Sequence, residues 1–488
     1  MDQQKSDIKF GTDGWRALIA REFTFENVAR VLQAYADVLA CRDAVPAPGR
    51  GHPAPTPNDQ PIPIGYDRRF LSQDFAQEAA SVLAANGFKV LLSKDFCPTP
   101  AISWMTKETQ APGGVMITAS HNPAPWNGVK FKEGYGGSAS PEFTDQVEKK
   151  IRPLGDKKSV DFQHAVTTQQ ITYFDPYQRY VRQLRSQVDV AKIRKAGWKI
   201  AYDSLFGAGS GYLTKVLETP LHEIHHEENP SFGGLNPEPI AQNLQPLIQH
   251  IRDNHLDVGL ATDGDADRIG AVDEAGNFVT PQQIFSLLLR HLIDKGGKGD
   301  VIKTVSTTQM IDRIAEKFGL PVHETPVGFK HICGKFLTTT PLIGGEESGG
   351  IGIPSHVYER DGLLSGLLLL EMMTERKKRL KVLLADLEKE IGHFVFLRED
   401  LHLTPQSIAR VRELLAQKDG PARGQNQIGP LKLTRINQMD GCKYYFADGS
   451  WLLFRASGTE PLVRIYAEAS DPAVVKQLLV AARTLLGA

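Results

Sequence analysis

The chain alternates between short apolar runs, bounded by turn residues, and segments with the periodicity of amphipathic helices. The pattern predicts strands at 61–67 and 88–93 joined by a helix over 73–85, with Ser72 as its cap. This arrangement is a βαβ unit. Two similar units are predicted later, from a strand at 199–203 with a helix near 211–217 and from a strand at 300–306 with a helix near 309–318. The pattern therefore predicts three α/β domains in series.

The C-terminal part of the chain follows a different pattern. Strand-like runs at 443–448 and 450–457 flank Gly449, another run lies at 463–469, and a helix is predicted over 472–486. Consecutive strands joined through glycine turns favour antiparallel pairing, so we expect a smaller α+β domain here. Nearer the N-terminus, the proline-rich segment 45–63 is interpreted as a solvated extended loop.

Composition and charge narrow the class of protein. The 488 residues are 41% hydrophobic, enough for several domain cores. Because 56 Lys and Arg balance 57 Asp and Glu, we expect no bulk attraction to nucleic acid or to a membrane surface. The first residues do not resemble a signal sequence, and the longest apolar run, 363–373, is too short and too interrupted to span a bilayer. We expect a cytoplasmic protein.

Cysteine usage excludes two further classes. The four cysteines are Cys41, Cys97, Cys333 and Cys442, and no two of them form a CxxC pair. This spacing supports neither a disulfide framework nor a cysteine zinc site. We expect these residues to be small members of the core.

The run TASHNPAPWNGVK, residues 118–130, places a serine directly after an apolar strand predicted at 113–118. Pro123 lacks an N–H and restricts Asn122, so the strand cannot continue. Ser120 is therefore expected on a presented loop, where its hydroxyl is a candidate nucleophile. An ordinary turn serine is the alternative.

A second loop gathers acidic residues. TDGDADRIGAV, residues 262–272, follows an apolar strand at 256–261 and precedes another strand. Alternation in extended chain would place Asp263, Asp265 and Asp267 on one side, where they repel unless a cation is present. Oxygen ligands favour Mg²⁺ over zinc. A calcium EF-hand is disfavoured because Arg268 stands where that loop needs glycine, while a solvated acidic turn stays open.

Two more loops suggest contacts to a phosphorylated sugar. GGEESGG, residues 344–350, predicts an exposed turn whose Glu346, Glu347 and Ser348 suit sugar hydroxyls, although a plain surface turn is the alternative. RASGTEPLVR, residues 455–464, predicts a phosphate cradle from consecutive N–H groups, hydroxyls and two arginines. It has no GxxxxGK[ST], so nucleotide hydrolysis is not indicated.

Three other features are given ordinary interpretations. FGAGSG at 206–211 is interpreted as a helix-entry turn rather than a dinucleotide loop. The histidines His222, His225 and His226 are interpreted as solvated surface, and the basic run 376–381 as the wet face of a helix.

Five motifs follow one another along nearly the whole chain: FGTDGWR, TASHNP with NGVK, DGDADR, GGEESGG and RxSGTEP. In this order they resemble the α-D-phosphohexomutase superfamily, in its phosphoglucomutase/phosphomannomutase branch. The resemblance implies an α/β fold of four domains around a central cleft, three with related mixed-sheet topology and a smaller C-terminal α+β domain. The expected domains are 1–168 (phosphoserine), 169–276 (metal), 277–392 (sugar) and 393–488 (phosphate).

The resemblance also implies roles for particular residues. Ser120 would carry a phosphoryl group, and Mg²⁺ would be held there with Asp263, Asp265 and Asp267. Arg16 and Lys130 would assist proton transfer. The implied sugar-binding residues are Glu346 and Ser348, with Lys303, Gly328 and Lys330 as further candidates that could equally be strand-end and turn residues. The implied residues for the distal phosphate are Arg455, Ser457, Gly458, Thr459 and Arg464.

These expectations combine into a two-step hypothesis. The phosphoserine gives its phosphoryl group to a hexose monophosphate, a hexose 1,6-bisphosphate turns over, and its other phosphoryl group returns to Ser120. Arg268 would neutralise phosphoryl charge or pair with its aspartates, and His121 would orient the serine loop or make a local turn contact.

Alternatives stay open for the reaction and the substrate. They are a phosphoglucosamine mutase, a metal-dependent phosphomonoesterase and a sugar-phosphate sensor without enzyme activity. The glucosamine branch typically shows DGDGDR and GEQSGH, from which Ala266 and residues 347–350 depart. Glucose and mannose phosphates therefore rank above glucosamine phosphate, and the sequence carries no sign of the oligomeric state.

Overall fold

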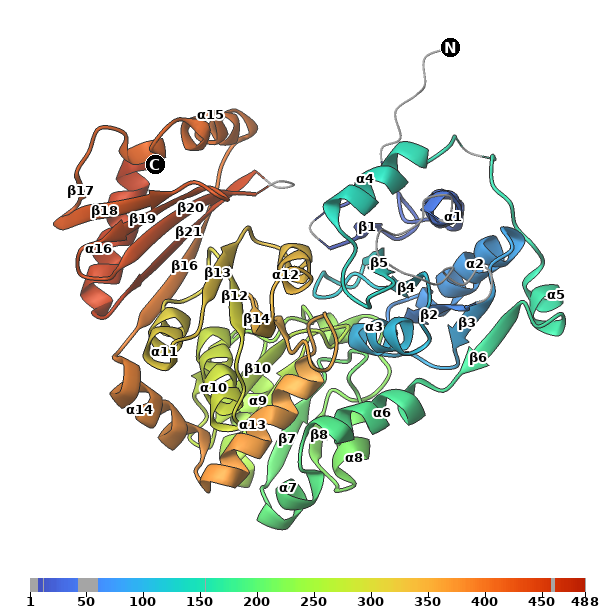
Figure 1. The fold of residues 1–488 in the computed structure, drawn as a ribbon, viewed down its shortest axis with the longest axis horizontal. Helices are drawn as coiled ribbons and strands as arrows, with labels where there is room; N and C mark the ends of the chain where they lie inside the picture. Colours follow the sequence, from blue (N-terminus) through green and yellow to red (C-terminus); the bar gives the residue numbers. More distant parts are fainter. Residues whose placement is uncertain (1–7, 12, 43–59, 154, 458–460, 488) are drawn as a thin grey trace.

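The computed structural model describes residues 8–11, 13–42, 60–153, 155–457 and 461–487. Four sheets follow one another along the chain, and Figure 1 shows the four domains that they define arranged in an arc. The predicted proline-rich loop lies outside the described residues except for its last part, from which Ile62 and Pro63 enter a strand.

Domain 1 is built on a mixed six-stranded sheet in the order β1–β5–β4–β2–β3–β6. Its elements are β1 (Trp15–Leu18), α1 (Phe25–Arg42), β2 (Ile62–Tyr66), α2 (Ser72–Ala85), β3 (Val90–Ser93), α3 (Thr99–Glu108), β4 (Gly113–Ile117), β5 (Trp126–Glu133), α4 (Pro141–Lys150), α5 (Phe162–Thr167) and β6 (Ile171–Phe174). The predicted βαβ unit is confirmed, but the predicted cap is wrong. Ser72 is the first helical residue and its hydroxyl donates to Asp67 instead.

Domains 2 and 3 also have mixed sheets, in the orders β11–β10–β9–β7–β8 and β13–β12–β14–β15. Domain 2 contains α6 (Pro176–Gln187), α7 (Val190–Ala196), β7 (Ile200–Asp203), α8 (Tyr212–Leu217), β8 (His222–Ile224), a 3₁₀ turn η1 (Phe232–Gly234), α9 (Gln245–Asn254), β9 (Val258–Thr262), β10 (Ile269–Asp273) and β11 (Phe278–Val279). Domain 3 contains α10 (Pro281–Asp294), β12 (Asp300–Thr304), α11 (Met310–Phe318), β13 (Val322–Thr325), α12 (Phe329–Phe336), β14 (Pro341–Gly345), β15 (Ile351–Gly352), α13 (Gly362–Arg376) and α14 (Leu380–Ile391).

One strand arrangement recurs in these three sheets. In each, three parallel strands are joined by a fourth that runs antiparallel: β3, β2, β4 and then β5; β8, β7, β9 and then β10; β13, β12, β14 and then β15. The loop from the third parallel strand into its antiparallel neighbour therefore occupies the same position in all three domains. The predicted series of related α/β domains is confirmed.

Domain 4 has the predicted antiparallel sheet, in the order β16–β21–β20–β19–β18–β17. Its elements are β16 (Val395–His402), α15 (Pro405–Ala416), a 3₁₀ turn η2 (Gly420–Ala422), β17 (Gln427–Ile428), β18 (Leu431–Asn437), β19 (Cys442–Phe446), β20 (Trp451–Ala456), β21 (Leu462–Ala469) and α16 (Pro472–Leu486). Leu478 and Ala482 of α16 pack with Phe454 and Ile465 of the sheet in a core of their own.

The cores show how firmly the domains are joined. One apolar cluster runs from α3 of domain 1 through domain 2 into domain 3, and the apolar run 363–373 lies inside it as part of α13. Domain 4 meets domain 3 through a small cluster that includes Val305, Trp451 and Tyr466. Within the described residues, no helix combines the length and apolar character needed to cross a membrane.

Several ordinary interpretations are tested by these elements. The turn at 206–211 leads into α8 as predicted. The basic run does not lie along one helix face: Arg376 ends α13, Lys381 lies in the first turn of α14, and residues 377–379 join the two helices. His222 and His226 are exposed, but the ring of the partly buried His225 contacts Asp203 at 3.0 Å, so its assignment to solvated surface was wrong. Cys41 is likewise exposed, whereas the other three cysteines are buried.

Candidate active site

The recurring loop position brings three of the predicted motifs together. Ser120 lies between β4 and β5, the aspartates between β9 and β10, and Glu346 with Ser348 between β14 and β15. A Cβ on Gly264 would lie 2.4 Å from the carbonyl oxygen of Ser120, so the acidic loop approaches the serine loop as only glycine allows. On the other side of the acidic loop, the N–H of Ile269 donates to the carbonyl oxygen of Gly349 at 3.0 Å. Three loops from three domains therefore form one site.

Ser120 is buried in this junction, with 1% of its surface exposed. Its Oγ donates to Asp263 Oδ2 at 2.8 Å, and its N–H donates to Thr118 Oγ1 at 2.9 Å. The backbone φ of 54° lies in the left-handed region, which costs a non-glycine residue about 1 kcal/mol. The expectation of a presented serine was wrong, because the acidic loop of domain 2 covers it.

Arg69 fixes the conformation of the serine loop. Its guanidinium donates to the carbonyl oxygens of Ser120 (2.6 Å), Asn122 (2.7 Å), Pro123 (3.0 Å) and Trp126 (3.0 Å). Its Nε donates to the buried Asp67 at 3.1 Å. A guanidinium supplies several fixed donors at once, so this arginine can hold a loop that has no regular secondary structure.

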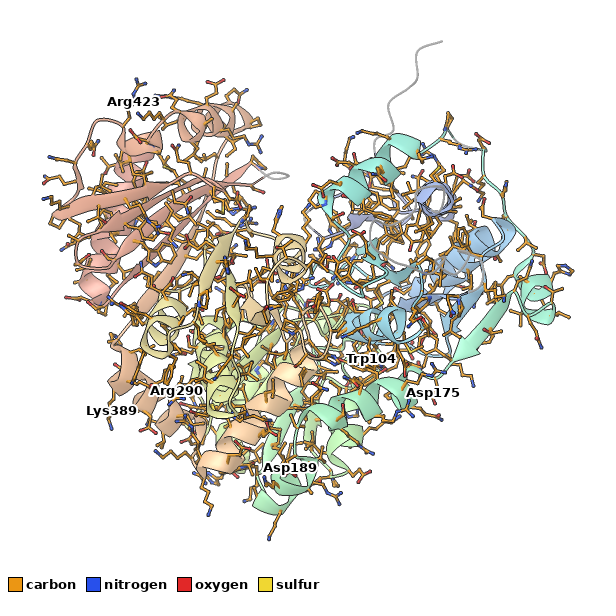
Figure 2. The ribbon with its side chains drawn as sticks, in the orientation of Figure 1. Trp104, Asp175, Asp189, Arg290, Lys389 and Arg423 are labelled. Atoms are coloured by element: carbon orange, nitrogen blue, oxygen red, sulfur yellow. The ribbon has the colours of Figure 1, made fainter. Side chains whose placement is uncertain are left out.

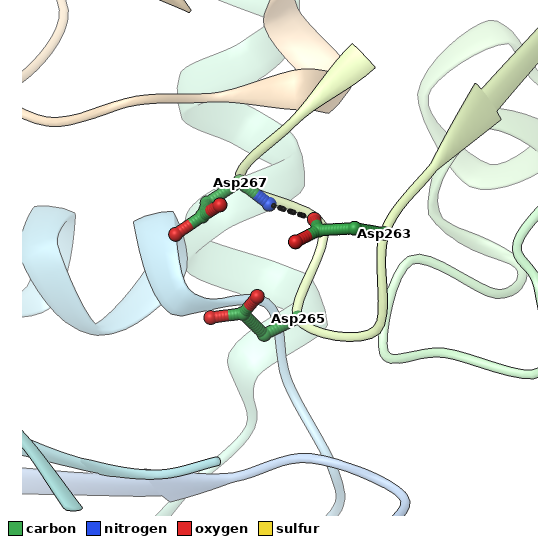
Figure 3. A group of neighbouring side chains, drawn as sticks. All are labelled: Asp263, Asp265 and Asp267. Carbon is green, nitrogen blue, oxygen red and sulfur yellow. Dashed lines mark hydrogen bonds between the residues drawn. The ribbon is translucent and has the colours of Figure 1, made fainter. Parts of the chain in front are cut away.

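The three aspartates converge from a tight turn (Figure 3). One ligand atom from each lies within 4.8 Å of the others, and all three residues are buried. Asp263 Oδ1 accepts from the backbone N–H groups of Asp267 and Arg268, both at 3.0 Å. Ala266 has a φ of 57°, so the chain folds back and the predicted extended alternation was wrong. The predicted clustering on one side is nevertheless found.

The electrostatics of this cluster call for a cation. Burial, together with the charges of Asp267 and Asp265, raises the pKa of Asp263 well above its ordinary value. Asp265 Oδ1 and Asp267 Oδ1 are buried, and the described residues offer neither a hydrogen-bond partner. Orphaned buried carboxylate oxygens are costly, and hard oxygen donors suit Mg²⁺. The residues present therefore fit a magnesium ion.

Cationic side chains surround the serine and the aspartates. Lys130 Nζ contacts Asp13, Asp265 and Asp267 at 2.7, 2.8 and 3.0 Å. Burial opposes its charge, but these carboxylates prevail and raise its pKa above the ordinary value. Burial alone would raise the pKa of Asp265, but the charge of Lys130 and the hydrogen bonds from Lys130 and Thr99 outweigh it and lower this pKa. Lys130 is therefore charged.

The remaining basic groups lie close by. Arg16 Nη1 donates to Asn122 at 2.8 Å, and Arg268 Nη1 donates to Glu238 at 3.2 Å while its Nε is 3.9 Å from Asp263. Burial and neighbouring cations, chiefly Arg268 and Arg16, hold the pKa of His121 well below its ordinary value. His121 is therefore a neutral imidazole in a cationic setting.

The loop from domain 3 is less exposed than predicted. Gly344 and Gly345 belong to β14, and Glu346 is only 5% exposed, while Ser348 is half-buried. Glu346 Oε1 accepts from the N–H of Gly328 at 3.1 Å. Burial raises the pKa of Glu346 to about 7 in spite of a nearby arginine. Gly328 thus supports this loop directly.

Two further candidates lie apart from it. Lys303 is buried and pairs with Asp312 and Glu324 near domain 4. Lys330 reaches back to domain 1, where its Nζ is 3.5 Å from the carbonyl oxygen of Gly11.

Domain 4 presents its own basic pair. Arg455 on β20 and Arg464 on β21 stand directly opposite in the antiparallel register. Like charges in this position repel, so an anion placed between them would be stabilising. Arg455 Nε donates to Asp440 at 2.8 Å, and Ser457 closes the strand pair by donating its N–H to Leu462 at 2.9 Å. The predicted Gly458 and Thr459 lie outside the described residues.

Sequence profiles match all four domains in order. They are the phosphoglucomutase/phosphomannomutase alpha/beta/alpha domains I (residues 7–157), II (178–276) and III (280–391) and the C-terminal domain (404–485). The chain belongs to the phosphoglucomutase/phosphomannomutase family. Its enzyme class is that of the family, an intramolecular phosphotransferase among the isomerases.

Relatives resemble this family member over its full length. A phosphoglucomutase/phosphomannomutase of Thermococcus kodakarensis is 30% identical over 96% of both chains, and a probable phosphoglucosamine mutase of Thermococcus gammatolerans is 30% identical over 98% of both. The crystal structure of a putative phosphomannomutase from Thermus thermophilus is 34% identical, with a TM-score of 0.83, and covers 99% of this chain and 100% of its own. The α/β fold of four domains is confirmed.

Three residues of this candidate site were missed by the sequence reasoning. Asp13 contacts Lys130, Arg69 holds the serine loop, and Arg360 contacts both Asp13 and Asp267. Asp13 belongs to the TDGWR motif, and this motif could have identified it as a site residue together with Arg16. Neither Arg69 nor Arg360 belongs to a motif used above, so nothing in the spacing distinguished them from other arginines.

Proposed function

We propose that this enzyme interconverts the 1-phosphate and 6-phosphate of glucose, mannose or both, through phosphorylated Ser120 and a hexose 1,6-bisphosphate. The single observation that supports it best is the 2.8 Å contact of Ser120 Oγ with Asp263 in a buried cluster of acidic and basic groups. A serine placed there can carry a phosphoryl group whose charge is neutralised on several sides.

The acidic cluster would hold the metal of this proposal. Asp263, Asp265 and Asp267 supply carboxylate oxygens, and Ser120 or its phosphoryl group completes the set. Mg²⁺ bound there would withdraw charge from the phosphoryl oxygens during transfer. The contact between Asp263 and Ser120 fixes the hydroxyl at the edge of the cluster, which is the position that a transferable group needs.

The basic residues would then stabilise the transferred group. Lys130 holds a proton in its present surroundings, so its first role is to hydrogen-bond to phosphoryl oxygens, with Arg16 and Arg268 as fixed cations nearby. Neutral His121 follows Ser120 directly and would orient the serine loop. Proton exchange with the sugar hydroxyl would fall to Lys130 once its acidic partners are neutralised.

Binding of the sugar and of its far phosphate would use the other two domains. Glu346 and Ser348 would bind hydroxyls, with Gly328 fixing Glu346, and Lys330 would approach from the side of domain 1. Arg455, Arg464 and the segment beginning at Ser457 would hold the phosphate that is not being transferred. Lys303 is already neutralised by Asp312 and Glu324, which favours a structural role over substrate contact.

One experiment separates this function from hydrolysis at the same serine. The purified enzyme is incubated with glucose 1-phosphate, Mg²⁺ and a trace of glucose 1,6-bisphosphate, and the products are resolved by chromatography. We expect glucose 6-phosphate, because a grip on both ends of the sugar favours return of the phosphoryl group. Release of inorganic phosphate as the main product would contradict the proposal.

A second candidate substrate is glucosamine phosphate. Several relatives of similar identity are named phosphoglucosamine mutase, including one from Carboxydothermus hydrogenoformans that is 27% identical over 96% of this chain and 97% of its own. Against it stand Ala266 and the sequence at 347–350, which depart from the glucosamine pattern. Parallel measurement of kcat/KM with the 1-phosphates of glucose, mannose and glucosamine decides, and we expect glucosamine to give the lowest value.

A further inference from the structure

We propose that Arg360 is a positioning residue of the active site, which sets the sugar loop of domain 3 (residues 346–350) against the acidic loop of domain 2 (residues 263–268) and against Asp13 of domain 1. This inference rests on the proposed function and deepens it. One side chain would align the groups that bind the sugar with the groups that transfer phosphate.

The contacts of Arg360 join three domains. Its Nη2 donates to Asp13 Oδ2 at 2.5 Å and to Asp267 Oδ2 at 2.7 Å, and its Nη1 donates to Glu346 Oε2 at 3.2 Å. The residue is only 3% exposed. Because a guanidinium is planar with fixed donor directions, these three carboxylates are held in one mutual arrangement.

The sugar loop leaves a space for this side chain at Gly350. A Cβ added to Gly350 would lie 2.3 Å from Cδ of Arg360 and 3.2 Å from Oε2 of Glu346. The backbone of Gly350 does not lie in the left-handed region, so close approach rather than φ requires glycine here. Gly350 and Arg360 are therefore a matched pair.

The groups that Arg360 holds are those closest to the proposed chemistry. Asp13 also contacts Lys130 Nζ at 2.7 Å, and Asp267 contacts it at 3.0 Å. Glu346 has its second oxygen bound by Gly328. A shift of Arg360 would therefore displace Lys130 and the sugar-binding carboxylate relative to each other.

Holding the domains together does not depend on Arg360. Lys132 and Ser138 of domain 1 both donate to Glu359, and Lys107 donates to the carbonyl oxygen of His356 at 2.8 Å. Trp104, labelled in Figure 2 on α3, stacks on the ring of His356 with centroids 5.8 Å apart. The junction of domains 1 and 3 is thus joined beside the site, which leaves alignment as the particular role of Arg360.

The test uses the variants Arg360→Lys, Arg360→Met and Gly350→Ala. The matched control is Lys107→Met, which removes a different contact between domains 1 and 3, the hydrogen bond from Lys107 to the carbonyl oxygen of His356. Lysine keeps the charge but not the fork, so we expect Arg360→Lys to keep the thermal midpoint near that of the wild type while kcat/KM falls about 100-fold. Binding of glucose 6-phosphate to the unphosphorylated protein, measured by calorimetry, should weaken about tenfold, as expected when one oriented hydrogen bond is lost. Lys107→Met should leave both values unchanged.

Gly350→Ala provides the independent arm. It should reproduce the loss of kcat/KM by displacing Arg360, and the double variant Gly350→Ala/Arg360→Met should lose no more than Arg360→Met alone. Full kcat/KM in Arg360→Lys, or additive losses in the double variant, would overturn the inference. If Arg360→Met does not fold, Arg360→Lys and Gly350→Ala decide it.

Failure of the proposed function and failure of the role of Arg360 give different results. A wild-type enzyme without mutase activity or without phosphate on Ser120 would refute the proposed function. An active wild type together with active Arg360→Lys and Gly350→Ala enzymes would refute only the role of Arg360.

Discussion

The proposed transfer site and the proposed phosphate-binding end of domain 4 differ in how they are built. At the first, buried groups from three domains interlock: Ser120 touches Asp263, Lys130 touches Asp265, and Arg360 touches Asp267. At the second, two arginines face each other on a sheet that has its own core and joins domain 3 through a small apolar cluster. The groups proposed to transfer phosphate are thus fixed in advance, while the groups proposed to bind the far phosphate belong to a separately packed domain.

This difference suits the proposed reaction, in which a bisphosphate would turn over between two transfers. Phosphoryl transfer needs a fixed geometry, whereas binding of either end of the bisphosphate needs a domain that can adjust its position. We therefore expect substitutions at the transfer site to lower kcat and substitutions in domain 4 to raise KM.

The largest effect is expected from Asp265→Asn. Removing one carboxylate weakens the metal site while easing the repulsion among buried acids, so the fold should persist. We expect kcat to fall about a thousandfold, corresponding to several kcal/mol of lost charge stabilisation. Conversion of glucose 1-phosphate and circular dichroism measure the two properties, with Asp386→Asn on α14 as a control. Unchanged turnover would remove the aspartates from the mechanism.

A smaller loss is expected from Arg69→Lys. An ammonium cannot donate to four carbonyl oxygens at once, so the serine loop should lose its fixed position and kcat should fall about 100-fold. Phosphate on Ser120 after treatment with glucose 1,6-bisphosphate, measured by intact mass, should be reduced as well. Wild-type kcat and full phosphorylation would show that the loop holds itself.

In domain 4, Arg455→Lys should act on binding alone. Loss of bidentate contact to a phosphate is expected to raise KM about tenfold with little change in kcat. Arg435→Lys on β18 is the matched control, since Arg435 is an exposed arginine of the same sheet. A fall in kcat with KM unchanged would contradict the assignment of domain 4 to binding and of the transfer site to turnover.

The smallest effect concerns the pH dependence of stability. The pKa of Glu346 is raised to about 7 in the folded protein, so the folded state binds more protons than the unfolded state as the pH approaches 7 from below. Protonated Glu346 therefore adds to the free energy of unfolding, and this addition is lost as the pH rises through 7. Between pH 6 and pH 7 the wild type should lose about 1 kcal/mol relative to Glu346→Gln. Urea unfolding of both proteins at the two pH values measures it, and parallel curves would contradict the assignment.

Much of the fold could be predicted from local pattern. The strands before Ser120 and Asp263 are short apolar runs that end at polar turns, and β20 and β21 are consecutive apolar runs, so their positions follow from nearby residues. The motifs also located the loops that carry the site. The recurring strand order then explains why loops far apart in sequence meet.

The parts that were not predicted arise from contacts between domains. Ser120 is covered by a loop 143 residues away, and Arg360 meets Asp13 across 347 positions. Hydrophobic periodicity describes the neighbours of a residue within its own element and contains no information on such partners. Arg69 and Arg360 therefore look like ordinary arginines until the domains are assembled.

The most direct test of the central claim follows one phosphoryl group. The enzyme is treated with glucose 1,6-bisphosphate and Mg²⁺, freed of ligand, digested and analysed by mass spectrometry, and a second portion is first chased with glucose 1-phosphate. We predict a phosphoryl group on Ser120 that moves to the sugar during the chase, and neither phosphorylation nor mutase activity in Ser120→Ala. A Ser120→Ala enzyme that still interconverts the two hexose phosphates would contradict the account.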